Sequence, residues 1–155
     1  MKMKLYLMRH GKADWADWDR PDDERPLNKQ GAKQMKRVAR ILRERGVAPA
    51  VILSSPLPRA RQTADHVAEA LGLAVTVEPM LAPGFDRLSL RELLKKHDQP
   101  TVMMVGHEPD LSNVIEDLTG GVVVMNKAAI ACVNVVDVDA PSGELLWLVT
   151  PKFLR

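Results

Sequence analysis

The chain alternates short apolar runs with longer segments in which apolar residues recur every three or four positions. Short apolar runs are typical of buried strands, and the longer spacing is typical of amphipathic helices. We expect about six strands, over Met3–Met8, Ala50–Leu53, Ala74–Val77, Thr101–Val105, Ala129–Val136 and Leu145–Val149. Strands that alternate with helices predict an α/β fold, here a three-layer αβα arrangement with a mostly parallel central sheet and helices on both faces.

The first helix has the clearest limits, because Asn28 can cap its start and Gly46 can end it. The second helix is expected to begin near Pro56 behind a cap from Ser54 or Ser55, and to end at Leu71. Two further helices are expected, over Leu88–His97 and from about Pro109 to the residue before Gly120.

The last two strands have no helix between them. The segment from Asp139 to Gly143 contains proline, serine and glycine, which are common in turns. We therefore expect an antiparallel hairpin at the C-terminal end of the sheet. The length of 155 residues suits a single domain over residues 1–155.

Composition excludes several classes of protein. A net charge of +2 is too small to indicate a nucleic-acid-binding protein. We expect neither a signal peptide nor a membrane span, since the first apolar stretch is broken at Arg9. Cys132 is the only cysteine, which rules out a disulfide within the chain and a thiolate metal cluster. Together these features favour the cytoplasm, and they make no prediction of oligomeric state.

Arginine and histidine side chains that could bind or attack a phosphate follow three of the expected strands. Arg9, His10 and Gly11 follow the first strand, Arg59 lies in the first turn of the helix after the second, and His107 follows the fourth. Open α/β sheets bind their ligands at the carboxyl ends of the strands. If the first and fourth strands are neighbours, His10 and His107 could face each other across one phosphate.

This set of side chains suits phosphoryl transfer. A phosphoryl group in flight carries its charge on three oxygens, and the guanidinium groups of Arg9 and Arg59 can neutralise them. His10 could attack phosphorus with one ring nitrogen if a backbone carbonyl near Gly11 accepts a hydrogen bond from the other. We expect no metal and no other cofactor, because the arginines supply the cationic charge.

Three segments together resemble the histidine phosphatase superfamily, the phosphoglycerate-mutase-like or RHG group. They are Leu7-Met8-Arg9-His10-Gly11, the Ser54–Ala64 segment with Arg59-Ala60-Arg61-Gln62-Thr63, and Val105-Gly106-His107-Glu108-Pro109. The small size, the Arg25-Pro26-Leu27-Asn28 helix entry and the absence of a cap domain are similar to its SixA-type phosphohistidine phosphatase branch.

The resemblance implies a role for each matching residue. His10 would be the phosphorylated nucleophile, and Arg9, Arg59 and His107 would complete the phosphate pocket. Arg25, Gly11 and Glu108 would bind substrate. The activity implied is removal of phosphate from phosphohistidine on a signalling or phosphotransfer protein, which would be the partner, with no nucleic acid or membrane involved.

The chain departs from the family pattern at the general acid. Many members carry a glutamate shortly after the third strand, where this chain reads Leu81-Ala82-Pro83-Gly84. Asp22, Asp23 or Glu24 could replace it, and its position before the Arg-Pro-Leu motif favours Asp22. A protonated phosphoimidazole leaves as neutral imidazole, whereas an ester leaves as an alkoxide that needs a proton. The missing glutamate therefore favours a P–N substrate.

Other interpretations remain open. The pocket could serve a small phosphomonoester metabolite, or could dock a phosphorylated partner without catalysis; mutase activity is less favoured. Trp15 and Trp18 could form a substrate-facing lid, a patch for a partner protein, or a minor core over the sheet. Thr63 could form a hydrogen bond within the pocket or only within its helix. His66, His97 and Arg61 have structural explanations. The basic positions of the first helix predict a solvated face that could also steer an acidic partner; they are Lys29, Lys33, Lys36, Arg37, Arg40 and Arg43.

Overall fold

A computed structural model describes residues 3–154, which form one six-stranded sheet with four α-helices. The strand order is β3-β2-β4-β1-β5-β6. β1 pairs in parallel with β4 and antiparallel with β5, which places it in the interior of the sheet. The strands are β1 (Met3–Arg9), β2 (Val51–Ser54), β3 (Val75–Val77), β4 (Thr101–Gly106), β5 (Ile130–Asp137) and β6 (Ser142–Val149).

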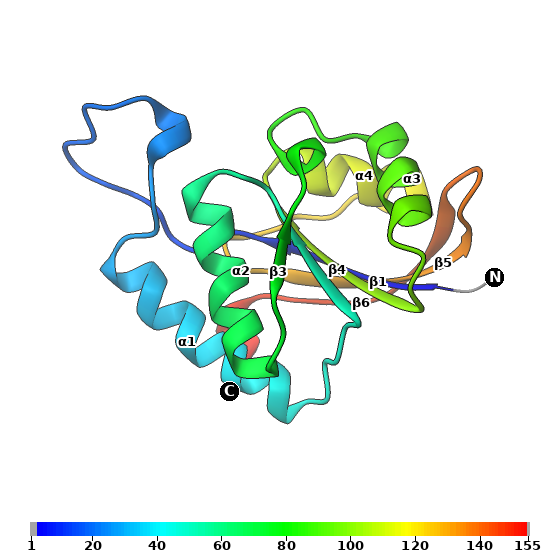
Figure 1. The fold of residues 1–155 in the computed structure, drawn as a ribbon, viewed down its shortest axis with the longest axis horizontal. Coiled ribbons are helices and arrows are strands. Elements are labelled where there is room, and N and C mark those ends of the chain that lie inside the picture. Colours follow the sequence, from blue (N-terminus) through cyan, green and yellow to red (C-terminus); the bar gives the residue numbers. More distant parts are fainter. Residues whose placement is uncertain (1–2, 155) are drawn as a thin grey trace.

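Two pairs of helices cover the two faces of the sheet. α1 (Lys29–Glu44) and α2 (Pro58–Leu71) lie on one face, and α3 (Arg87–Lys96) and α4 (Asp110–Thr119) lie on the other, as Figure 1 shows. The expected three-layer α/β fold, with its mostly parallel sheet and its antiparallel C-terminal hairpin, is confirmed.

The sequence of β1 explains why both faces are covered. Successive side chains of a strand point to opposite faces. Leu5 and Leu7 pack in the core beneath α3 and α4, whereas Tyr6 and Met8 pack in the core beneath α1 and α2. Because nearly every side chain of β1 is buried, water reaches the strand only at its ends.

Asparagine and proline set the starts of α1 and α2. The Asn28 side chain accepts a hydrogen bond from the Gly31 amide at 2.7 Å, which confirms the predicted cap of α1. The predicted start of α2 behind Ser54 or Ser55 is wrong, because its N-cap is Leu57. Pro58 forces the residue before it into extended backbone, so the helix cannot begin earlier.

The last strand of the hairpin begins earlier in the sequence than expected. β6 begins at Ser142, three positions before the predicted Leu145. The Asp137 carboxylate accepts hydrogen bonds from the amides of Asp139 and Ala140 and so fixes a tight turn. Gly143 lies where a Cβ atom would be 2.4 Å from the Asn134 carbonyl oxygen, so only glycine permits this strand pairing.

Within residues 3–154, none of the helices combines the length and the apolar character needed to cross a bilayer.

Candidate functional site

The pairing of β1 with β4 brings the two histidines together. Arg9 lies opposite Gly106 in this pairing, so His10 and His107 follow at the same edge of the sheet. Their ring centroids are 5.4 Å apart. The condition set for this arrangement, that the first and fourth strands are neighbours, is confirmed.

The His10 ring is held by its own neighbour. Its Nδ1 atom lies 2.7 Å from the Gly11 carbonyl oxygen, which can only accept a hydrogen bond. The proton therefore resides on Nδ1, and Nε2 keeps its lone pair. Burial and, to a smaller extent, the neighbouring His107, Arg59 and Arg9 lower the pKa of His10 to about 3, so the ring is neutral at pH 7.

Thr63 links Gly11 to α2. The Gly11 amide donates to Thr63 Oγ1 at 3.0 Å, and the same hydroxyl donates to the Arg59 carbonyl at 2.7 Å. Thr63 is fully buried. Of the two roles open for this threonine, the structure shows contact with the pocket, since one hydroxyl positions both the loop after β1 and the first turn of α2.

The two arginines approach the histidines from different elements. Arg59 is buried and donates from Nη1 to the Asp22 carbonyl at 2.8 Å and from Nη2 to the Asp22 carboxylate at 3.1 Å. Arg9 donates from Nη1 to the Met125 carbonyl at 3.0 Å. The buried Nε atoms of both arginines have no hydrogen-bond partner within residues 3–154, so each has a donor available for an anion.

The His107 ring is oriented by Ser55, a residue whose role sequence reasoning missed. His107 Nε2 lies 2.8 Å from Ser55 Oγ, and both side chains are buried. His107 Nδ1 is buried with no partner among the described residues. Burial and the positive charges of Arg59 and Arg9 lower the pKa of His107 to about 4.

The loop between β1 and α1 supplies the outer wall of the site. The short 3-10 helix η1 (Asp22–Glu24) carries Asp22, whose carboxylate accepts a hydrogen bond from Arg25 Nε at 3.0 Å. Arg25 also donates to the Ala13 carbonyl. The hydrogen bond from Arg25 and the charge of Arg59 hold the pKa of Asp22 below its usual value.

These side chains surround a cavity of about 450 Å³, which we call the catalytic cavity. Every predicted site side chain lines it, together with Asp14, Pro83 and Lys127, which were not predicted. The full lining is Arg9, His10, Asp14, Asp22, Arg25, Arg59, Pro83, His107, Glu108 and Lys127. Gly11 acts from behind, through its carbonyl. Asp23 and Glu24, the other candidate acids, are not part of the lining.

The other two carboxylates of the lining, Asp14 and Glu108, also have hydrogen-bond partners. Asp14 accepts from Lys127 Nζ at 2.6 Å, a pair that joins residues far apart in the sequence. Glu108 accepts from the Ser112 amide at 2.8 Å and from its hydroxyl at 2.5 Å, which fixes the first turn of α4. Glu108 therefore shapes the cavity wall as well as facing the cavity.

The minor core that was one interpretation of the two tryptophans is not formed. Trp15 and Trp18 pack against each other, with ring centroids 5.9 Å apart, and neither belongs to the core or to the cavity lining. Trp15 donates to the Pro26 carbonyl and Trp18 to the Pro21 carbonyl. They brace the loop, which projects from the body of the fold in blue in Figure 1.

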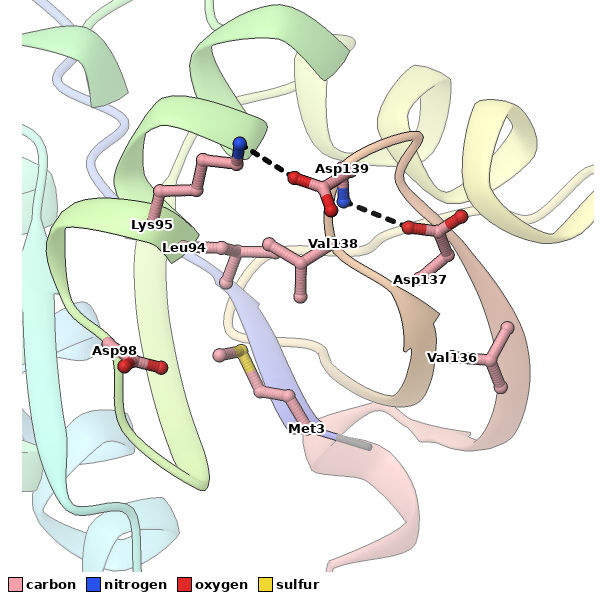
Figure 2. A pocket seen from close by; sticks show the side chains of 8 residues that line it. All are labelled: Met3, Leu94, Lys95, Asp98, Val136, Asp137, Val138 and Asp139. Atoms are coloured by element: carbon pink, nitrogen blue, oxygen red, sulfur yellow. Dashed lines mark hydrogen bonds and ion pairs between the residues drawn. The ribbon is translucent and has the colours of Figure 1, made fainter. Parts of the chain in front are cut away.

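A second cavity lies at the opposite end of β1, between α3 and the β5–β6 hairpin (Figure 2). Apolar side chains such as Met3, Leu94 and Val138 line it, and an ion pair of 2.6 Å between Lys95 and Asp139 crosses it. It lacks the histidines and arginines of the catalytic cavity. Residues 3–154 contain no group of three or more histidine, cysteine or acidic side chains arranged to hold a metal ion.

An α/β protein with a cationic cavity around a neutral, oriented histidine belongs among the proteins that handle phosphoryl groups. Residues 5–83 match the sequence model of the histidine phosphatase superfamily, branch 1. The chain belongs to the histidine phosphatase superfamily.

Similar proteins agree with this membership. An uncharacterised protein of Picosynechococcus sp. strain PCC 7002 is 36% identical over 164 residues, which cover 98% of this chain and 99% of the relative. The phosphohistidine phosphatase SixA of Escherichia coli strain K12 is 27% identical over 160 residues, covering 99% and 97% of the two chains.

A solved structure of the protein histidine phosphatase SixA in complex with tungstate superposes with a TM-score of 0.86. The identity is 28%, and the match covers 99% of this chain and 100% of the other. The superfamily and the likeness to SixA support a phosphatase activity for this chain.

Proposed function

We propose that this protein is a metal-independent phosphatase that works through a phosphohistidine intermediate on His10. Its proposed substrate is phosphohistidine on a signalling or phosphotransfer protein. The observation that carries the proposal is the hydrogen bond from His10 Nδ1 to the Gly11 carbonyl, which leaves Nε2 free beside two arginines. No added cation is required, because Arg9 and Arg59 supply the positive charge.

In the first step His10 Nε2 attacks phosphorus while the P–N bond of the substrate breaks. A substrate imidazole that is protonated on its other nitrogen leaves as neutral imidazole. In the second step water attacks phosphorus and the bond to Nε2 breaks. The products are neutral His10 and dihydrogen phosphate, which carries both protons of the water.

The surrounding donors would stabilise the phosphoryl oxygens in both steps. Arg9 and Arg59 each have a buried Nε donor with no partner among the described residues. His107 Nδ1 is likewise buried and has no partner among them. Preorganised donors of this kind cost no reorganisation as charge develops on the oxygens. Arg25, at the edge of the cavity, would contact the substrate beyond its phosphate.

The lining carboxylates favour a substrate with a good leaving group. The pKa values of Asp14 and Asp22 lie below their usual values because of hydrogen bonds from Lys127 and Arg25, and Glu108 is bonded to Ser112. A partnered carboxylate is a poor proton donor. Asp22 could act as an acid only in a complex where substrate replaces it on the two arginines.

The openness of the site supports a protein substrate. Asp14 and Asp22, at its outer edge, keep about two thirds of their side-chain surface exposed, at 66% and 67%. We propose that residues 1–155 form one domain without a cap, so that a histidine on another protein can reach His10. The free Nε2 argues against a pure docking module, because docking needs the arginines and not a nucleophile.

A trapping experiment tests the mechanism. Phosphohistidine protein carrying labelled phosphate should transfer label to the wild-type chain and to a His66→Ala control, but not to His10→Ala. Loss of the nucleophile should lower kcat about a thousandfold or more. Hydrolysis by His10→Ala at the wild-type rate would contradict the mechanism. Vanadate should inhibit and a chelator should not.

A substrate comparison tests the specificity. We expect kcat/KM for phosphohistidine protein to exceed that for a panel of small phosphomonoesters, because the site lacks an available proton donor. A clear preference for one ester would replace the proposed substrate with a small metabolite and leave the mechanism standing.

A further inference from the structure

A third cavity, of about 350 Å³, adjoins the catalytic cavity. Arg9 and Lys127 line both cavities, so the two meet at these side chains. We call this neighbour the lysine pocket. Its charged and amide residues are Arg9, Lys12, Lys127, Lys152, Gln34 and Asn126.

The charge of the lysine pocket is of one sign. Its lining contains four cationic side chains and no carboxylate, and one of the four, Lys127, is paired with Asp14 of the catalytic cavity at 2.6 Å. Arg9 Nε at the shared wall is a buried donor without a hydrogen-bond partner among residues 3–154. Like-charged groups around a hollow attract a counter-ion, so the pocket is suited to an anionic ligand.

The walls of the lysine pocket are fixed by the main chain. The Arg9 amide donates to the Ala129 carbonyl at 3.0 Å, and the Ala128 amide donates to the His10 carbonyl at 3.0 Å. The C-terminal segment that carries Lys152 is held by Arg37, which donates to the Leu154 carbonyl at 2.6 Å. A preformed pocket binds its ligand without an ordering cost.

We propose that the lysine pocket binds an acidic side chain of the substrate protein, next to the phosphohistidine, while the phosphoryl group occupies the catalytic cavity. This inference rests on the proposed function. The inference follows from Arg9, which lines both cavities. A ligand that occupies the two cavities at once must present a second anionic group beside its phosphate.

The kinetic test compares two phosphohistidine peptides, one flanked by glutamates and one by glutamines. We expect the wild type to prefer the acidic peptide. The double variant Lys12→Gln/Lys152→Gln should lose about fivefold in kcat/KM on the acidic peptide at low salt, through KM, because contacts with partly exposed charges are modest. It should keep its rate on the neutral peptide. The control Lys33→Gln/Lys36→Gln removes the same charge from an α1 surface that lines neither cavity.

Equal losses of kcat/KM on both peptides, or an equal loss in the control variant, would overturn the proposal.

A second measurement tests the lysine pocket even if the true substrate is an ester. An unphosphorylated glutamate-rich peptide should competitively inhibit hydrolysis of a small phosphorylated substrate by the wild type, and should inhibit the double variant about fivefold less well. Inhibition by free succinate as strong as by the peptide would assign the pocket to a small carboxylate ligand instead. Failure of the wild type to hydrolyse either phosphohistidine peptide would count against the proposed function, and the inhibition test would still decide on the pocket.

Discussion

Ser55 Oγ lies 2.8 Å from His107 Nε2 and also accepts a hydrogen bond from the Leu57 amide at 3.2 Å. We expect the hydroxyl proton to point to Nε2, which would place the proton of the neutral ring on Nδ1, the buried atom without a partner among the described residues. In the proposed mechanism, Ser55 would thereby orient His107 so that Nδ1 donates to the phosphoryl group.

We predict that Ser55→Ala lowers kcat about tenfold, the effect of losing one orienting hydrogen bond of about 1.4 kcal/mol. Ser54→Ala is the matched control, because the hydroxyl of this equally buried neighbour donates to the Ser55 carbonyl and not to a histidine. Nitrogen NMR of His107 should show a loss of the Nδ1–H tautomer only in Ser55→Ala. Retention of both the tautomer and the rate would show that Ser55 is merely a packing residue.

The stability of the fold should fall as the pH drops from 6.5 toward 4. Burial lowers the pKa of His10 to about 3 and that of His107 to about 4, below the value of 6.5 expected in the unfolded chain. In that window the unfolded state binds more protons, so each histidine reduces the free energy of unfolding by about 1.4 kcal/mol per pH unit.

Urea denaturation at several pH values measures this slope. The variant His10→Asn should show a shallower slope than the wild type between pH 6.5 and 4. Equal slopes would mean that His10 is as easily protonated in the folded protein as in the unfolded chain. Proton NMR should accordingly find both rings titrating well below pH 6.5.

Asp22→Asn should tighten inhibition by vanadate. The Asp22 carboxylate is paired with Arg25 and Arg59, so an incoming dianion competes with it for both guanidinium groups. Removing the charge should lower the vanadate inhibition constant about threefold, a modest change because the carboxylate is well exposed. Phosphohistidine hydrolysis should persist, whereas ester hydrolysis should fall if Asp22 supplies its proton. Weaker vanadate binding would identify Asp22 as a support for Arg59.

Thr63→Val should destabilise the fold by about 1–3 kcal/mol, since it leaves a buried amide of Gly11 without an acceptor. It should also lower kcat, because Gly11, whose carbonyl orients His10, loses its anchor on α2. Thr119→Val is the control: Thr119 makes the same two bonds in α4, donating to the Ile115 carbonyl and accepting from the Gly121 amide. A loss of kcat in both variants would point to general destabilisation.

Local patterns predicted most of the fold and the inner part of the site. Arg9, His10 and His107 follow strands whose carboxyl ends share one edge, so their proximity followed from the topology of a parallel sheet. The apolar face of α1 and the cap by Asn28 were equally visible in the sequence. These features depend on residues close together in the chain or on the general rules of α/β winding.

The rest of the site depends on contacts that no local pattern encodes. The Asp14–Lys127 pair joins residues 113 positions apart. Ser54 or Ser55 was expected to cap α2, and only the fold shows that the Ser55 hydroxyl reaches His107. The signal that could have revealed it is Pro58, which keeps the preceding residues out of the helix and so leaves the Ser55 hydroxyl free for another partner.

The interior position of β1 affects how the chain acquires its activity. β1 precedes its neighbours in the sequence, since Lys4 pairs with Thr101 and Asn134. We therefore expect β1, the strand that leads to His10, to stay unpaired during synthesis until most of the chain has emerged. Contacts this distant along the chain form slowly. The proposed phosphate pocket, and with it enzymatic competence, would then arise only with the completed sheet.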